Sequence, residues 1–220
     1  MNQWKGKKWY CYGTSMTDNS VPEGGSRKGF YTETLSKLSG LEEHNFGKGG
    51  SGIIPKFHGD DNIKSRCMRL TDGKAEADLI TVEIIPNDMK GELGEVTDLC
   101  DDTFCGNLNQ IIEYLLYNTK ATVVVLIASR SRYRHKDPSA KFLPTGEQVK
   151  KRLMWENAVA TICSMHGIQC WNGASEACLG YHRFDRDNTL IQDQIHLTEK
   201  GGEVLGKYFW GKLMTIFPNE

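Results

Sequence analysis

Short apolar runs alternate with longer segments of helical periodicity along the chain. The β-rich runs are "KWYCY" (8–12), "EEHNF" (42–46), "ADLITVEII" (77–85), "ATVVVLIA" (121–128) and "IQCW" (168–171). Segments with helical spacing follow them at 28–39, 62–70, 107–118, 145–166 and 198–216. Repetition of strand and helix is typical of a parallel sheet that is covered by helices on both faces. We therefore predict an α/β fold, with the segments 86–106 and 129–144 as loops.

Local signals support particular elements of this pattern. The runs 79–85 and 121–128 are apolar except for Thr81, Glu83 and Thr122, which indicates strands buried on both faces. Thr145 and Gln148 form a capping box ahead of the fourth helical segment, and Gly167 follows its end.

Composition and charge narrow the class of protein. A chain of 220 residues with 39% hydrophobic residues can bury one substantial core, so we expect a single domain over 1–220. A net charge of -1 argues against nucleic acid as a partner, and no apolar run approaches the ~20 residues that span a bilayer. Without a signal-peptide pattern at the N-terminus, a cytoplasmic location is expected by default. A signal removed from the natural protein would instead imply secretion or a periplasmic location.

The seven cysteines are odd in number, scattered, and never in a CxxC spacing. Reduced and mostly buried thiols are favoured over a disulfide framework. The adjacent acidic pairs at 60–61 and 101–102 are interpreted as solvated loop residues, so no metal site is predicted.

A serine follows the first predicted strand in "WYCYGTSMTD". Gly13 allows a sharp turn, and Ser15 would then lie at the carboxyl edge of the sheet among unpaired N–H groups that can stabilise an oxyanion. Taken alone, a serine at this position is more often a turn former or a helix cap than a nucleophile.

A nucleophilic serine requires a base, and the base requires an orienting group. In "LIQDQIHLTEKGG", Asp193 precedes His196 by three residues, a spacing at which the carboxylate can reach the imidazole Nδ1. The alternative is that both residues cap the last helix. The remaining histidines are interpreted as surface or packing residues (His44, His58, His135, His166 and His182).

Two further loops offer hydrogen-bond donors at strand ends. The glycine-rich "HNFGKGGSGI" (44–53) follows the second strand, and "EIIPNDM" (83–89) places Asn87 after the third. The glycine patterns of nucleotide-binding loops are absent from the sequence, which argues against a nucleotide cofactor.

Together these four segments resemble blocks I, II, III and V of the SGNH (GDSL-type) hydrolases, in the same order and across 8–206. The G-x-S-x-G elbow of α/β-hydrolases is absent. The resemblance implies a three-layer, flavodoxin-like α/β/α sandwich with a parallel five-stranded sheet. It implies Ser15 as nucleophile, His196 as general base and acid, and Asp193 as its orienter.

The resemblance also implies an oxyanion hole made by the Ser15 and Gly50 N–H groups and the Asn87 side chain. Gly49 and Gly52 remain alternatives to Gly50. The chain departs from the family pattern at two positions: Thr14 replaces the aspartate of G-D-S, and Ile85 replaces a glycine two residues before Asn87. We expect Thr14 to form a local hydrogen bond in place of the carboxylate.

The basic loop "SRSRYRHKD" (129–137) follows a central strand and therefore lies near the same sheet edge. It is either a solvated or oligomer-forming segment or a substrate rim made by Arg130, Arg132, Tyr133 and Arg134. An oligomer is compatible with the sequence.

The function expected from the resemblance is that of a cofactor-independent serine esterase. The polar loops of this chain favour, as the substrate, an O-acetyl or other short-chain ester of a small molecule or a carbohydrate. A lysophospholipase or thioesterase would share the same catalytic residues, and a non-catalytic carbohydrate-binding protein would share the fold.

Overall fold

The computed structural model describes residues 2–20, 29–70, 76–85, 87–129, 146–177, 179, 189–192 and 196–218. Its centre is a five-stranded sheet of order β2-β1-β3-β4-β5 in which every pairing is parallel. The strands are β1 (Lys8–Gly13), β2 (Glu42–Gly47), β3 (Leu79–Glu83), β4 (Thr122–Ile127) and β5 (Gln169–Asn172). The predicted α/β fold with a parallel five-stranded sheet is therefore confirmed.

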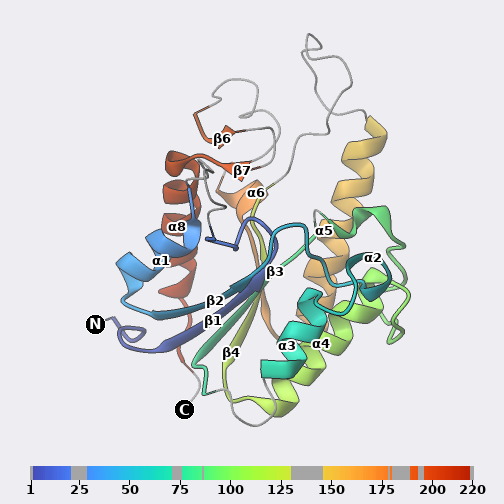
Figure 1. Ribbon diagram of the computed structural model, residues 1–220, viewed down its shortest axis with the longest axis horizontal. Coiled ribbons are helices and arrows are strands. Elements are labelled where there is room, and N and C mark those ends of the chain that lie inside the picture. Colours follow the sequence, from blue (N-terminus) through green and yellow to red (C-terminus); the bar gives the residue numbers. More distant parts are fainter. Residues whose placement is uncertain are drawn as a thin grey trace.

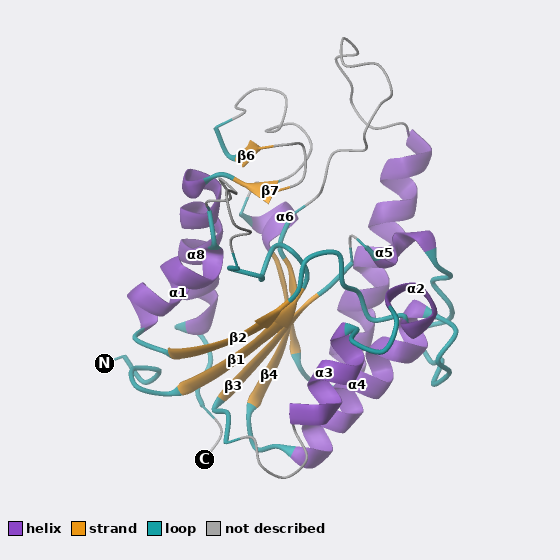
Figure 2. Cartoon of the chain, in the orientation of Figure 1, coloured by secondary structure: helices purple, strands orange, loops and turns teal. Residues whose placement is uncertain are grey.

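Helices cover both faces of this sheet, as Figures 1 and 2 show. One face carries α1 (Tyr31–Ser39) and α8 (Glu199–Leu213), which pack against each other. The opposite face carries α3 (Ile63–Leu70), α4 (Phe104–Asn118) and α5 (Gly146–Met165). Three shorter helical turns lie in connections: α2 (Pro55–His58), η1 (Asp88–Lys90) and α6 (Gly173–Glu176).

The core forms two apolar layers, one on each side of the sheet. Along β4, Val123, Val125 and Ile127 face the layer under α4 and α5, while Val124 and Leu126 face the layer under α1 and α8. Successive side chains of a strand point to opposite faces, so a strand covered on both sides is apolar at every position. This is why the run 121–128 lacks the alternation of an exposed strand.

Several boundaries differ from those predicted. Helix α4 begins at Phe104 rather than 107, because the Thr103 side chain caps it by accepting a hydrogen bond from Gly106 N. A short antiparallel pair, β6 (Ile191–Gln192) and β7 (His196–Leu197), precedes α8 and was not predicted. Thr145 of the proposed capping box lies outside the described residues.

The cysteines in the described residues are free thiols. Four are buried and Cys100 is exposed, in agreement with the expectation of reduced, mostly buried side chains. None of the helices in the described ranges combines the length and hydropathy needed to cross a membrane.

Strand order determines which loops meet at the carboxyl edge. Because β1 lies between β2 and β3, the loops that follow these three strands are neighbours. They carry the segments in which Ser15, Gly50 and Asn87 occur. Open parallel sheets bind ligands in this position, outside the carboxyl ends of their strands.

Candidate active site

Ser15 lies in a tight turn immediately after β1. The Thr14 carbonyl accepts hydrogen bonds from Thr17 N (3.1 Å) and Asp18 N (2.9 Å), which closes one helical turn around the serine. A Cβ on Gly13 would lie 2.2 Å from Thr17 Oγ1. The glycine is therefore required by close packing of this turn against the strand end, rather than by a left-handed backbone.

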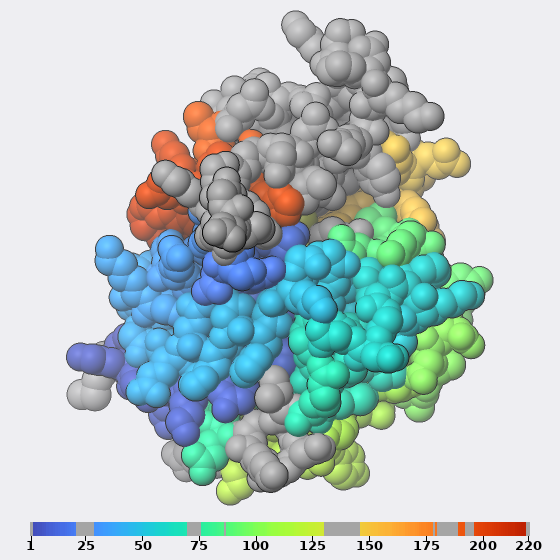
Figure 3. Space-filling model, viewed as in Figure 1, coloured from blue at the N-terminus to red at the C-terminus, as the bar shows by residue number. Residues whose placement is uncertain are grey.

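His196 faces this serine from the other end of the chain. Its Nε2 lies 2.9 Å from Ser15 Oγ, a hydrogen-bonding distance between groups 181 residues apart in sequence. Figure 3 shows the corresponding contact of segments, with blue N-terminal residues bordering orange and red C-terminal residues. A base within hydrogen-bonding distance of a serine hydroxyl is the first geometric requirement of nucleophilic catalysis.

The alternative role of His196 as a helix cap does not fit this geometry. Thr198 is the N-cap of α8, and its Oγ1 accepts a hydrogen bond from Gly201 N at 3.1 Å. His196 instead begins β7, which places its ring beside the β1 turn. Asp193 lies outside the described residues, so its role as the orienter of His196 remains a prediction.

The glycine-rich loop after β2 is tied to the Ser15 turn by backbone contacts. Lys48 N donates to Gly13 O at 3.0 Å, and Gly49 N donates to Asp18 Oδ2 at 2.8 Å. Gly50 has a left-handed backbone (φ 75°), which glycine adopts without strain. Because the Gly49 N–H is taken by Asp18, it is a poorer oxyanion donor than Gly50, whose N–H has no recorded acceptor within the described ranges.

Asn87 reaches the same loop from the end of β3. Its Nδ2 donates to Ser51 O at 2.7 Å, which uses one of the two amide protons and fixes the orientation of the side chain. The second proton is the donor that the predicted oxyanion hole requires. The loops after β2 and β3 thus brace each other beside Ser15.

Thr14 Oγ1 forms the expected local hydrogen bond by accepting from Met16 N at 3.2 Å, but the shorter bonds of Thr14 are to a residue distant in sequence. Both its backbone N–H and its Oγ1 donate to Glu83 Oε2 at 2.7 Å. Thr17 Oγ1 makes a longer contact of 3.3 Å with the same oxygen. Glu83, the last residue of β3, is fully buried and anchors the Ser15 turn to the neighbouring strand.

The surroundings of Glu83 raise the pKa of its carboxyl group to about 7. Burial is the main cause, and it outweighs the opposing effects of the Thr14 and Thr17 hydrogen bonds and the charge of Arg152. Glu83 was not identified as a site residue from the sequence. The available signal was an acidic residue at the end of an otherwise apolar strand.

Ile85 shows how the second departure from the family pattern is accommodated. Its backbone has φ 110°, a region that glycine enters readily and branched residues rarely adopt. The side chain is fully buried in the layer that contains Ile54 and Val82. The glycine-type backbone before Asn87 is therefore retained with an isoleucine, held there by the packing of its side chain.

Arg66 is a further residue that the sequence did not single out. Its buried guanidinium donates through Nη2 to Gly13 O and to Ser51 Oγ, both at 3.2 Å, and through Nη1 to Asp61 O at 2.7 Å. One side chain of α3 thereby links the Ser15 turn to the glycine-rich loop. No sequence motif marks this role, which depends on the position of α3 beside β1.

The proposed rim residues Arg130, Arg132, Tyr133 and Arg134 lie outside the described residues, and their role remains a prediction. In the acidic pairs, Asp61 contacts Lys48 (2.6 Å) and Asp101 contacts Lys64 (2.6 Å). Within the described part of the chain, no group of three or more His, Cys, Asp or Glu side chains has the arrangement of a metal site.

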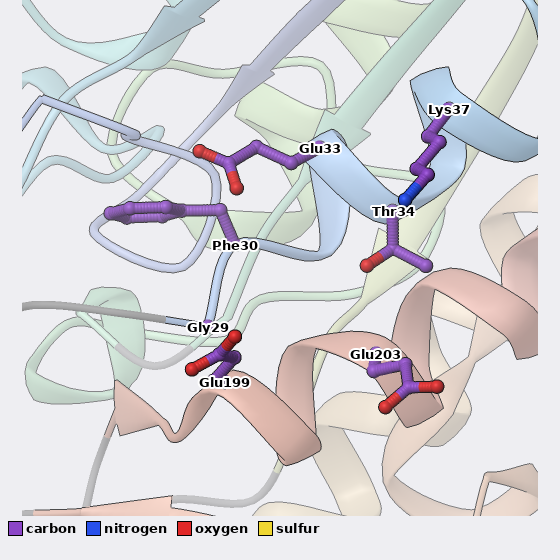
Figure 4. Close-up of a pocket in the computed structure, with 7 residues that line it drawn as sticks. All are labelled: Gly29, Phe30, Glu33, Thr34, Lys37, Glu199 and Glu203. Atoms are coloured by element: carbon purple, nitrogen blue, oxygen red, sulfur yellow. The ribbon is translucent and has the colours of Figure 1, made fainter.

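A hollow of about 270 Å³ opens between α1 and α8 (Figure 4). Its lining contains none of the proposed catalytic or oxyanion residues and is formed by Gly29, Phe30, Glu33, Thr34, Lys37, Glu199 and Glu203. Three carboxylates and one ammonium make it an acidic surface feature separate from Ser15.

The similarity of this chain to known proteins is in structure only. No family model and no curated protein matches the chain. A solved structure of a Lactobacillus plantarum protein is 20% identical with a TM-score of 0.78, covering 97% of this chain and 99% of its own. A GDSL-like lipase from Bacteroides ovatus is 12% identical (TM-score 0.66, 96% and 100% covered). A carbohydrate acetylesterase from Sinorhizobium meliloti is 13% identical (TM-score 0.65, 96% and 100% covered).

Identities this low establish the fold rather than the reaction. The parallel sheet, the serine turn after β1 and the histidine before the last helix occur here in the arrangement that the sequence motifs implied. The chain has the fold of the SGNH hydrolases.

Proposed function

We propose that this protein is a serine esterase that removes acetyl or another short acyl group from a small or carbohydrate substrate. The observation that carries the proposal is the 2.9 Å separation of Ser15 Oγ and His196 Nε2. This contact joins the hydroxyl and the base at the carboxyl edge of the sheet. The loops after β2 and β3 supply candidate oxyanion donors there.

The chemistry follows from these groups. His196 Nε2 accepts the Ser15 proton while Oγ attacks the ester carbonyl, and the imidazolium then returns the proton to the leaving alkoxide. The N–H groups of Ser15 and Gly50 and the Asn87 amide would stabilise the oxyanion, at about 3 kcal/mol for each donor. Water then attacks the acyl-serine by the same route, so the reaction uses only side chains, backbone amides and water.

The preference for a short acyl group and a sugar-like alcohol rests on two supports. The loops around the proposed site are polar, and one structural neighbour is a carbohydrate acetylesterase. A lysophospholipase or thioesterase would use the same Ser15 and His196 and would differ only in the surface that receives the acyl chain and the leaving group.

The test combines turnover of p-nitrophenyl acetate with covalent labelling by a fluorophosphonate probe. The wild type should hydrolyse the ester and carry the label on Ser15, and Ser15→Ala should lose both. Ser175→Ala removes an exposed hydroxyl from α6 and serves as the matched control, with activity and labelling retained. A wild type that shows neither hydrolysis nor labelling would refute the enzyme and favour a binding protein.

Substrate class is tested with a panel of acetylated sugars, p-nitrophenyl esters of increasing chain length, and acyl thioesters. The proposal predicts the highest kcat/KM for acetyl esters, with a decline as the acyl chain lengthens. A preference for long-chain lysophospholipids or thioesters would contradict the acetylesterase assignment while leaving the role of Ser15 in place.

A further inference from the structure

His58, the last residue of α2, has an imidazole that is almost enclosed, with a side chain only 3% exposed. Its Nδ1 lies 3.1 Å from the Gly50 carbonyl oxygen. Its Nε2 lies 3.4 Å from Asp88 Oδ1, and the Asp88 side chain is fully buried. The ring therefore bridges the glycine-rich loop after β2 and the residue that follows Asn87.

The neighbours of the ring determine how it is held. A carbonyl oxygen only accepts hydrogen bonds, so the contact with Gly50 requires a proton on Nδ1. Asp88 Oδ1 accepts from Ile53 N (2.9 Å) and Ile54 N (3.1 Å), and His58 Nε2 lies beside this oxygen without a hydrogen-bond partner among the described residues. The ring is therefore anchored through Nδ1 and packed against Asp88 on its other side.

The close approach of the ring to Asp88 is built into the loop. Ile53 and Ile54 provide two donors to Asp88 Oδ1, and His58 Nε2 lies 3.4 Å from the same oxygen. Gly52 permits this approach, because a Cβ there would lie 2.4 Å from both Asp88 Oδ1 and His58 Nε2.

The consequence falls on Gly50, the predicted oxyanion donor. On its N-terminal side, the N–H of Gly49 is held by Asp18; on its C-terminal side, the Gly50 carbonyl faces His58. The peptide group that carries the Gly50 N–H therefore lies between two anchored atoms, Gly49 N and the Gly50 carbonyl oxygen. Preorganised donors stabilise a developing oxyanion because they require no reorganisation during the reaction.

We propose that His58 is a positioning residue which, packed against Asp88, holds the Gly50 carbonyl through its Nδ1 proton and thereby orients the oxyanion-hole loop. The kinetic part of this inference rests on the proposed esterase function. The bridge that His58 forms between Gly50 and Asp88 is a property of the folded chain and can be measured without any substrate.

The first experiment is therefore spectroscopic. Full-length protein with ¹⁵N-labelled histidine rings is examined by NMR at pH 7, and His58→Gln identifies the His58 signals. We expect His58 Nδ1 to carry a hydrogen-bonded proton, and Asp88→Asn to change the signals of the ring. A wild-type ring without a proton on Nδ1, or a ring unaffected by Asp88→Asn, would overturn the bridge.

The second experiment separates positioning from a purely structural role. Asparagine at 58 places an amide N–H near the position of Nδ1, whereas glutamine places one near Nε2. His58→Asn should keep the donor to Gly50 and lose the partner of Asp88, so it should be the less stable variant and yet keep kcat within about threefold. His58→Gln should be more stable but lose about tenfold in kcat at unchanged KM, less than the 10²–10³ for an oxyanion donor itself.

The two variants should therefore rank in opposite order for thermal stability and for kcat, and a purely structural role of His58 would not produce this result. If kcat follows thermal stability across the two variants, His58 supports the fold only and the positioning role is refuted. A wild type that hydrolyses no ester would refute the proposed function, and the NMR measurement would then still decide whether the bridge between Gly50 and Asp88 exists.

Discussion

The buried carboxyl group of Glu83 gives a prediction that can be worked through from the structure. Glu83 Oε2 accepts two hydrogen bonds of 2.7 Å from Thr14, and Oε1 has no hydrogen-bond partner within the described residues. The substitution Glu83→Gln removes the titrating proton and retains one oxygen that can accept from Thr14. It therefore isolates the contribution of charge from that of shape.

The sign of the effect follows from the pKa of Glu83. Burial raises this pKa from its ordinary value of 4.5 to about 7, so between these pH values the folded protein binds more protons than the unfolded chain. The free energy of unfolding must then fall as the pH rises across that window. A shift of this size corresponds to about 3 kcal/mol of stability, present below pH 4.5 and lost as the pH rises through 7.

The assay is urea unfolding at a series of pH values from 4.5 to 8 for the wild type and Glu83→Gln. Relative to the variant, the wild type should lose about 3 kcal/mol across this range, because all other titrating groups are shared and cancel in the difference. Glu203→Gln, at an exposed residue paired with Lys207, is the control and should leave the wild-type profile in place. Parallel profiles for the wild type and Glu83→Gln would refute this account of Glu83.

Three further predictions concern the loops beside Ser15. Asn87→Ala should lower kcat for p-nitrophenyl acetate by about 10²–10³ with little change in KM, and an unchanged kcat would remove Asn87 from the oxyanion hole. Ile85→Ala should be less stable to urea than Ile85→Gly by about 1 kcal/mol, since alanine keeps a Cβ at φ 110°; the reverse order would contradict strain at this residue. Gly52→Ala should destabilise the protein by about 1–3 kcal/mol, since its Cβ would overlap Asp88. Gly211→Ala, with no atom within 4 Å, should instead stabilise α8 by about 0.5 kcal/mol, and equal effects would contradict the packing argument.

The main elements could be predicted from the sequence because their signals are local. Continuous apolar runs at 79–85 and 121–128 indicated strands buried on both faces, and helical spacing identified the five long helices. Element ends were less predictable. The Thr103 cap moved the start of α4, and the short pair β6 and β7 had no periodicity to reveal it.

The candidate site was predictable where a residue belongs to a short motif. Ser15, Gly50 and Asn87 were proposed from motifs at strand ends and His196 from the motif before the last helix, and the structure brings Ser15 and His196 to within 2.9 Å. Glu83, Arg66 and His58 were not identified. Each acts through a partner that is remote in sequence, and a histidine, arginine or glutamate by itself carries no information about that partner.

The sequence by itself determined the alternation of strands and helices, the residues at the strand ends, and the two departures at Thr14 and Ile85. These are properties of neighbours along the chain. Only the tertiary structure decided that β1 lies between β2 and β3, so that three loops meet beside Ser15. It also decided that Thr14 bonds Glu83 and that His58 faces Asp88. Such pairs are set by the packing of strands and helices across the sheet, because burial brings polar groups from distant segments into contact and requires each to find a partner.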